Sequence, residues 1–214
     1  MTRPSSSSDR KLIDAGKALA LKHGLVGLSV RETCREAGVN LGMFHYHFKT
    51  KKEFEHRILK ELYGEFLSTF KLELESTANP RQRLKNLICV IGRFLRDNRR
   101  SVALIVKDLL SGREETLTFL KENFTAHMSL LVQTLKECQS KGILRNDIPL
   151  YNSLPALVLP VVVPCAVVGA VEVNEYVGLL PLAVKAIKPL IISDKAIAER
   201  AELGLRALAP VEKI

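Results

Sequence analysis

The sequence predicts an all-α protein of about nine helices, and three observations support this fold class. Apolar residues recur every three or four positions along most of the 214 residues, which is the period of amphipathic helices. No stretch alternates apolar and polar residues for long, and the hairpin dipeptides Asn-Gly and Asp-Gly do not occur. Ser, Thr, Asp or Asn precedes many of the periodic segments, and glycine follows several, as is typical of helix ends.

The first two helices have clear capping residues. Residues 1–8 are rich in serine and lack an apolar core, so we expect a disordered arm and no secretory signal. Asp9 caps a helix that runs to about residue 22. Ser29 caps a second, short helix, and Glu32 stands three residues later, which completes a capping box. Gly38 ends this helix in a tight turn that requires a positive φ angle.

The third and fourth helices follow directly. Asn40 caps a short third helix, whose Leu41 and Phe44 we expect to face inward. Thr50 caps a long fourth helix over residues 51–75. Two apolar stripes run along it, and either can be its buried face: Phe54, Ile58, Leu62 and Phe66, or Leu59, Tyr63, Phe66 and Phe70.

The remaining helices are expected over residues 80–96, 99–110, 114–140, 150–172 and 193–208, with a further helix around 180–187. Asn79 followed by Pro80 is typical of a helix start, because proline is well tolerated at the first helical position. Gly112 and Gly142 mark helix ends, and Ser193 caps the last helix.

The composition of the chain changes near residue 50. We expect a three-helix domain over residues 9–50 and a domain of longer helices over residues 51–214. The formal net charge is +9 for the whole chain, of which residues 1–60 carry +6. A local excess of basic residues indicates a polyanionic partner, either a nucleic acid or an anionic membrane surface.

The sequence shows no pattern typical of a metal site or an enzyme. His45 and His47 are two residues apart, so they diverge on a helix, and no HExxH or GxSxG motif occurs. We therefore predict no catalytic residue, no metal and no cofactor. The cysteines lie far apart and are expected to be reduced and buried, as in a cytoplasmic protein: Cys34, Cys89, Cys138 and Cys165.

One segment is apolar enough to be compared with a transmembrane helix. Residues 154–171 form 18 positions without a charge, close to the length that spans a bilayer. However, three prolines interrupt the segment, and Glu172 and Glu175 follow it without a basic flank or an aromatic belt. We favour a kinked, buried helix and expect no association with a membrane.

Residues 29–48 have the pattern of a helix-turn-helix, in which the second helix enters the major groove of DNA. The first short helix ends in Ala37, Gly38 and Val39, where the glycine permits the turn and the valine can pack between the helices. Asn40 opens the second helix, whose N-terminal residues are then the ones that face base edges.

At these residues the sequence resembles the TetR (tetracycline repressor) family of bacterial transcriptional regulators. Two positions differ, because Cys34 stands where alanine is common and His45 where the family usually has a tyrosine that contacts phosphate. The family's motif is matched identically at Val30, Ala37, Gly38, Val39, Gly42, His47, Phe48 and Lys51. It is matched conservatively at Ser29, Asn40, Phe44, Thr50 and Phe54.

The resemblance implies a DNA interface in this segment. Candidate contacts to bases or phosphates are Asn40, Met43, His45 and Tyr46. Helix N-termini attract anions, which makes further phosphate contacts of Ser29, Arg31 and Lys51. Either His45 or Tyr46 takes the place of the family's tyrosine, whereas His47 and Phe48 are expected to pack rather than to bind.

The resemblance also implies that the larger domain dimerises and holds a small-molecule pocket. Residues 150–172 and 193–208 are the expected homodimer contact, in a four-helix arrangement. Aromatic residues are the candidate pocket for an unknown hydrophobic ligand, although an ordinary place in the core competes with this role for each of them: Phe66, Phe70, Phe94, Phe124 and His127.

The predicted function is therefore that of a transcriptional regulator. We expect a repressor that binds double-stranded operator DNA as a homodimer and leaves it when the ligand binds. Two alternatives stay open at this point. A membrane-associated helical protein would use the basic N-terminus and residues 154–171, and a protein-binding or enzymatic helical bundle would keep the helix-turn-helix only for packing.

Overall fold

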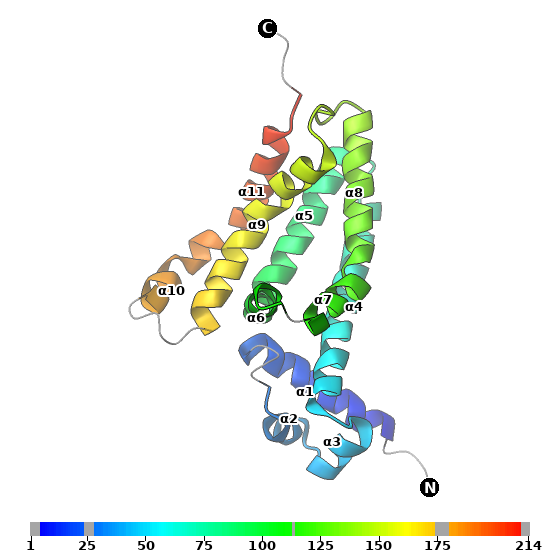
Figure 1. The fold of residues 1–214 in the computed structure, drawn as a ribbon, viewed down its shortest axis with the longest axis vertical. Coiled ribbons are helices and arrows are strands. Elements are labelled where there is room, and N and C mark those ends of the chain that lie inside the picture. The colour runs from blue at the N-terminus through cyan, green and yellow to red at the C-terminus, as the bar shows by residue number, and fades with distance from the viewer. Residues whose placement is uncertain (1–4, 24–27, 113, 174–179, 211–214) are drawn as a thin grey trace. The chain divides into compact units, whose positions relative to one another are not determined.

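The computed structural model describes residues 5–23, 28–112, 114–173 and 180–210. Within these residues the chain forms eleven helices and no strand (Figure 1), which confirms the all-α prediction. The expected helix over residues 114–140 is interrupted at Phe124, and the further helix expected around residues 180–187 forms at Leu180–Ile191. These two features explain why the count exceeds nine. The chain divides into two compact units, Met1–Glu65 and Phe66–Ile214.

The first unit contains α1 (Ser5–His23), α2 (Val30–Ala37), α3 (Leu41–His47) and the beginning of α4 (Lys51–Glu75). Residues 5–8 belong to α1, so the helix starts earlier than the expected disordered arm over residues 1–8 allowed. Serine is only a few tenths of a kcal/mol less favourable than alanine in a helix, so a run of serines does not stop a helix from extending backwards.

One hydrophobic core holds the first unit together. Phe44 and Ile58 are fully inaccessible to solvent, and Phe54 is nearly so. Because Phe54, Ile58 and Leu62 of α4 all belong to this core, the units divide after Glu65, inside α4, and not at residue 50. Helix α1 approaches α4 closely at Gly16, where a Cβ atom would lie only 2.5 Å from Cδ1 of Ile58.

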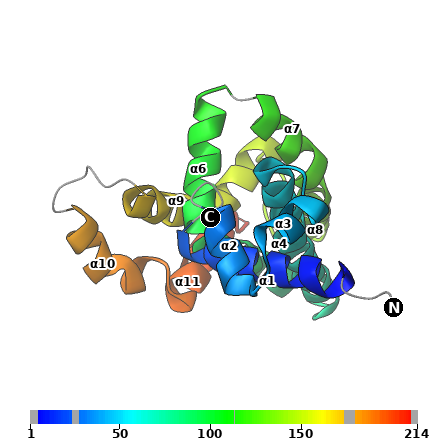
Figure 2. The ribbon, with the colours of Figure 1, turned by 90° about the horizontal axis from the view of Figure 1, so that it is seen from below.

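The second unit is built around α9 (Leu150–Val173). Helices α5 (Pro80–Asp97), α6 (Arg99–Leu110), α10 (Leu180–Ile191) and α11 (Asp194–Ala207) all pack against α9. Helix α7 (Glu114–Asn123) connects α6 to α8 (Thr125–Ser140), which packs on α5. Helices α10 and α8 lie at opposite edges of this unit in both views (Figures 1 and 2).

Glycines at two crossings allow α9 and its neighbours to pack backbone against side chain. At Gly92 of α5, a Cβ atom would lie 2.5 Å from Cγ1 of Val161. At Gly169 of α9, a Cβ atom would lie 2.1 Å from the backbone oxygen of Arg99 at the start of α6. Any side chain at Gly169 must therefore push α6 and α9 apart.

A third crossing joins α9 to α11 at Gly204. A Cβ atom there would lie 3.1 Å from the backbone oxygen of Ala156. This carbonyl has no N–H donor four residues later in its own helix, because residue 160 is a proline. The Cα hydrogen that Gly204 carries in place of a side chain points at this oxygen, a weak interaction that suits close helix contacts.

Helix α9 has one buried and one exposed face. It is the one described helix that is long and apolar enough to cross a membrane by length and composition, and 28% of its most apolar window is buried. The sequence predicted a kinked, buried helix; the three prolines lie inside the helix, but burial is limited to one face. That face carries Leu157, Val161, Cys165 and Val168. The opposite face exposes Leu159, Val163 and Val167.

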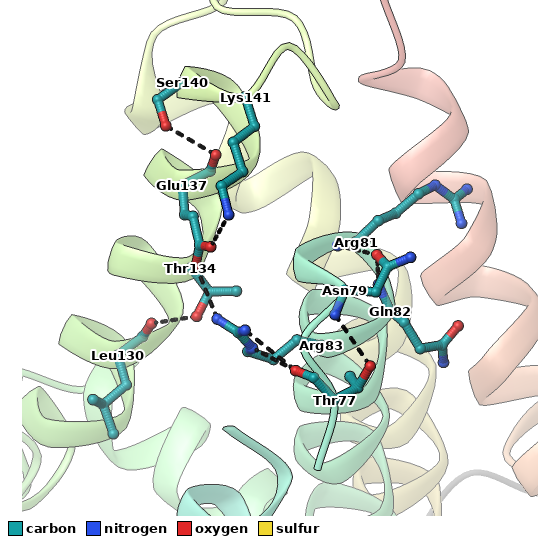
Figure 3. Close-up of polar contacts among 10 residues, drawn as sticks. All are labelled: Thr77, Asn79, Arg81, Gln82, Arg83, Leu130, Thr134, Glu137, Ser140 and Lys141. Carbon is teal, nitrogen blue, oxygen red and sulfur yellow. Dashed lines mark hydrogen bonds and ion pairs between the residues drawn. The ribbon is translucent and has the colours of Figure 1, made fainter. Parts of the chain in front are cut away.

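Polar contacts join the start of α5 to α8 (Figure 3). The predicted cap is confirmed, since Oδ1 of Asn79 accepts a hydrogen bond from the N–H group of Arg81 at 3.0 Å. Arg83 donates from Nε and Nη2 to the backbone oxygen of Thr77, at 3.2 Å each, and its Nη1 lies 2.9 Å from Oε2 of Glu137. One guanidinium thus fixes the turn between α4 and α5 against α8.

Candidate nucleic-acid interface

Helix α2 begins and ends at the residues that the sequence indicated. The N–H group of Glu32 donates to Oγ of Ser29 at 3.3 Å, which confirms the cap. Gly38 has a φ angle of +63°, a conformation that side chains other than glycine rarely adopt. The N–H group of Val39 donates to the oxygen of Cys34 at 2.9 Å, which closes the turn as in a Schellman motif.

Helix α3 presents most of its side chains to solvent. Oδ1 of Asn40 accepts a hydrogen bond from the N–H group of Met43 at 2.9 Å and so caps the helix. Phe44 is fully buried, with ring centroids 5.0 Å from Phe54 and 5.5 Å from Phe48. Leu41 is 43% exposed, so its expected inward orientation is wrong. The short helix buries one side chain fully, and Phe44 takes that place.

The residues that follow Phe44 become progressively more buried towards the end of α3. His45 is exposed, and Tyr46 has 72% of its surface exposed. His47 is half-buried, with its ring 5.1 Å from that of Tyr46 and 6.2 Å from that of Phe48. Phe48 is buried. His47 and Phe48 therefore pack, as the sequence predicted, and Tyr46 projects outward.

The seven expected DNA-contact residues all lie in the first unit, around α3. Met43 is half-buried, and the other six are exposed or sit at exposed caps: Ser29, Arg31, Asn40, His45, Tyr46 and Lys51. Helices α2 and α3 pack against each other (Figure 1). Sequence reasoning did not include three further exposed cations of the same segment, Arg35, Lys49 and Lys52. The lysine-rich run over residues 49–52 was the signal for the last two.

The carboxylate of Glu53 binds the backbone at the N-terminus of α4. Thr50 caps the helix, with its Oγ1 accepting from the N–H group of Glu53 at 3.1 Å. Oε2 of Glu53 in turn accepts from the N–H group of Lys49 at 3.2 Å. This carboxylate already lies at the helix N-terminus, where a phosphate would otherwise bind. The exposed side chain of Lys51 lies 3.3 Å from Oε1 of Glu55.

The five residues expected to line a ligand pocket lie together in the second unit. The ring of His127 lies 5.1 Å from Phe66, 5.9 Å from Phe70 and 5.3 Å from Phe124, measured between centroids. Phe94 joins the cluster through Phe66, at 4.6 Å. These are distances between rings in contact. A ligand that enters this aromatic cluster must therefore separate its rings.

His127 is the ionisable member of the aromatic cluster. Its side chain is buried, with 5% of its surface exposed. Burial lowers the pKa of His127 from 6.5 to about 4, because the charged imidazolium loses its hydration. His127 is therefore neutral at physiological pH, and the aromatic cluster carries no charge.

Comparison with known proteins agrees with this geometry. Residues 12–57 match the profile of the bacterial regulatory proteins of the tetR family. Over 139 residues, 64% of this chain and 70% of the relative, the chain is 20% identical to the HTH-type transcriptional repressor KstR2 of Mycobacterium tuberculosis.

Solved structures share the fold of nearly the whole chain. The fatty acid degradation regulator FadR from Bacillus halodurans matches with a TM-score of 0.67 and 16% identity, over 95% of this chain and 97% of that one. The transcriptional regulator FadR from Bacillus subtilis, in complex with stearoyl-CoA, matches with a TM-score of 0.60 and 18% identity, over 86% and 98% of the two chains. The capped helix-turn-helix and the match over residues 12–57 thus identify this part of the chain as similar to the N-terminal region of the tetR-family regulatory proteins.

Proposed function

We propose that the protein is a cytoplasmic, homodimeric repressor that binds operator DNA through α3 and is released by an apolar small molecule. The observation that carries this proposal is the surface of α3. A helix that follows a tight turn exposes Asn40, His45 and Tyr46 while Phe44 anchors it to the core. Polar and aromatic side chains on a firmly held helix suit contact with base edges and phosphates.

Charge supports a phosphate backbone as the partner of this surface. Exposed cations stand on both sides of α3, with Arg31 and Arg35 on α2 and Lys49, Lys51 and Lys52 at the start of α4. Cations in such positions release counterions from DNA when they bind phosphates. They are therefore expected to orient the first unit on the duplex, while α3 distinguishes its sequence.

The exposed face of α9 supports a homodimer. Leu159, Val163 and Val167 each have about half of their surface exposed, with values of 51%, 49% and 54%. Contiguous apolar surface of this kind usually marks an interface. Helix α11 packs beside α9, so α9 and α11 of two copies together can form the four-helix contact that the sequence suggested. A partner subunit covers these side chains without requiring a membrane.

The aromatic cluster around His127 is our candidate for the ligand site. Its phenyl rings and neutral imidazole favour an uncharged, apolar ligand portion. The stearoyl-CoA bound by the Bacillus subtilis FadR carries an apolar acyl chain, which is the kind of group that suits such a site. Ligand entry must separate the rings, and this packing change is the proposed source of the differential affinity that releases DNA.

Sequencing of genomic fragments selected by the purified protein tests the proposal. The wild-type protein should enrich a small set of palindromic sites, because two identical subunits read two half-sites. Tyr46→Ala should lose this enrichment, whereas the matched variant Leu72→Ala, at a position 69% exposed on α4, should keep it. Equal enrichment by both variants would show that α3 does not read the DNA.

A further inference from the structure

The outward face of α11 carries opposite charges on either side of an exposed leucine. Leu203 has 62% of its surface exposed. Glu199 precedes it by four residues and Arg206 follows it by three, and their side chains are 62% and 72% exposed. Residues at these spacings lie on one face of a helix, one turn apart. The face thus reads acidic, apolar, basic along the helix.

Such a face is complementary to itself when a second copy lies antiparallel to it. We propose that α11 pairs with α11 of the partner subunit around a two-fold axis that passes beside Leu203. This pairing rests on the proposed homodimer and specifies its register. Leu203 contacts its own equivalent at the axis, and Glu199 faces Arg206 of the partner subunit. Symmetry repeats this ion pair on the other side of the axis.

The ion pair that Arg206 forms within its own chain leaves its guanidinium able to bind a carboxylate of the partner subunit. Arg206 lies 3.3 Å from Oε1 of Glu202, a carboxylate that also contacts Arg81 at 2.6 Å and Lys85 at 3.0 Å. Hydrogen bonds from Arg81 and then Lys85 lower the pKa of Glu202 to about 2, so its charge is already well compensated. A guanidinium has five N–H donors, so that of Arg206 can also donate to a second carboxylate.

Glu199 is similarly available. Within the same chain it pairs with Lys195, four residues earlier, at 3.9 Å, and 85% of the lysine side chain is exposed. Exposed pairs of this kind contribute little to stability, so exchanging this pair for an intersubunit pair costs little. Glu199, Leu203 and Arg206 themselves help to line a cleft of about 460 Å³, into which side chains of a second copy can project.

Cysteine cross-linking tests the register directly. Facing helices pack about 8–10 Å apart, which brings residues at a two-fold axis within the Cα separation of about 4–7 Å that a disulfide requires. Leu203→Cys should therefore form a covalent dimer under mild oxidation. Leu72→Cys, with similar exposure on α4, should not, and neither should the wild-type protein, whose four cysteines are all buried.

Light scattering on the same samples separates the register from the proposed dimer. A dimer in which Leu203→Cys cross-links no more than Leu72→Cys would overturn the α11 pairing and leave the proposed function standing. A monomer at micromolar concentration would overturn both. Dimer formation with efficient cross-linking at residue 203 supports both.

Charge exchange provides an independent test. Glu199→Arg replaces two attractive intersubunit pairs by repulsive ones and should weaken dimerisation roughly tenfold. The double variant Glu199→Arg with Arg206→Glu restores opposite charges and should return the dissociation constant to within about threefold of the wild type. A double variant that dimerises no better than the single one would reject the pairing of residues 199 and 206. Sedimentation equilibrium measures these constants.

Discussion

His45 and Tyr46 are adjacent on α3 and differ in what they can offer to DNA. Both are exposed, and Tyr46 has 72% of its surface accessible. Its ring meets the ring of His47 edge to face, with the centroids 5.1 Å apart. The phenol can donate a hydrogen bond to a phosphate oxygen or to a base. We therefore favour Tyr46 in the place of the family's tyrosine.

Single substitutions decide between these two residues. Tyr46→Phe removes one hydroxyl and should weaken operator binding about five- to tenfold, as expected for the loss of one hydrogen bond of about 1 kcal/mol. His45→Ala should change affinity less. Fluorescence anisotropy with a duplex from the genomic selection measures both. A larger loss for His45→Ala than for Tyr46→Phe would assign the contact to His45.

His127 makes the stability of the second unit depend on pH. Its pKa falls from 6.5 to about 4 on folding, so between these values the unfolded chain binds a proton that the folded chain does not. The contribution of neutral His127 to the free energy of unfolding should be fully present above pH 6.5. It should fall as the pH drops towards 4, by on the order of 3 kcal/mol in total.

Denaturation with urea at pH 7 and pH 4.5 tests this prediction. The carboxylates contribute their own pH dependence, so the informative quantity is the difference between the wild type and His127→Gln. The variant should lose less stability than the wild type over this range. The same loss in both proteins would show that His127 is not the responsible group.

At the scale of the elements, glycine crossings determine how α9 packs. Gly169→Ala would place a methyl group 2.1 Å from the backbone oxygen of Arg99, which cannot move without shifting α6. We expect a loss of about 1–3 kcal/mol in the free energy of unfolding, as for other overpacked sites. Gly64→Ala is the control, because nothing lies within 4 Å of its Cβ position, and it should stabilise α4 by up to about 1 kcal/mol. A neutral Gly169→Ala would mean that α6 and α9 are not in this close contact.

Elements set by local chemistry were predictable from the sequence. The caps at Ser29, Asn40, Asn79 and Ser193 form as expected, because each depends on one side chain and the N–H groups that follow it. The interruption at Phe124 was not predictable. This residue keeps helical backbone angles, φ −93° and ψ −3°, and neither glycine nor proline marks the change from α7 to α8.

Burial was harder to predict than helix formation. Helix α9 is apolar all round, so its sequence gives no sign of which face packs against α5 and which stays exposed. The predicted burial of Leu41 was wrong for a related reason, because periodicity alone does not show that Phe44 fills the available space in the core. The aromatic residues named as pocket candidates do lie together, because aromatic residues on neighbouring helices tend to meet. Its contact distances required the structure.

At the scale of the whole molecule, ligand binding and DNA binding must be coupled if the proposal is right. The chain has no tryptophan, so Phe124→Trp introduces a single fluorescent reporter at the aromatic cluster. A titration with stearoyl-CoA as the probe should shift its emission and lower operator affinity over the same concentration range. A shift in emission with unchanged operator affinity would place the probe at a site that does not control DNA binding.

The central claim is that two copies of α3 read operator DNA symmetrically, and a hydroxyl-radical footprint on the selected site tests it most directly. We predict two equivalent protected regions related by a dyad, with major-groove centres about 34–36 Å apart along the duplex. Both regions should weaken together in Tyr46→Ala. A single asymmetric region, or protection that survives this substitution, would contradict the account.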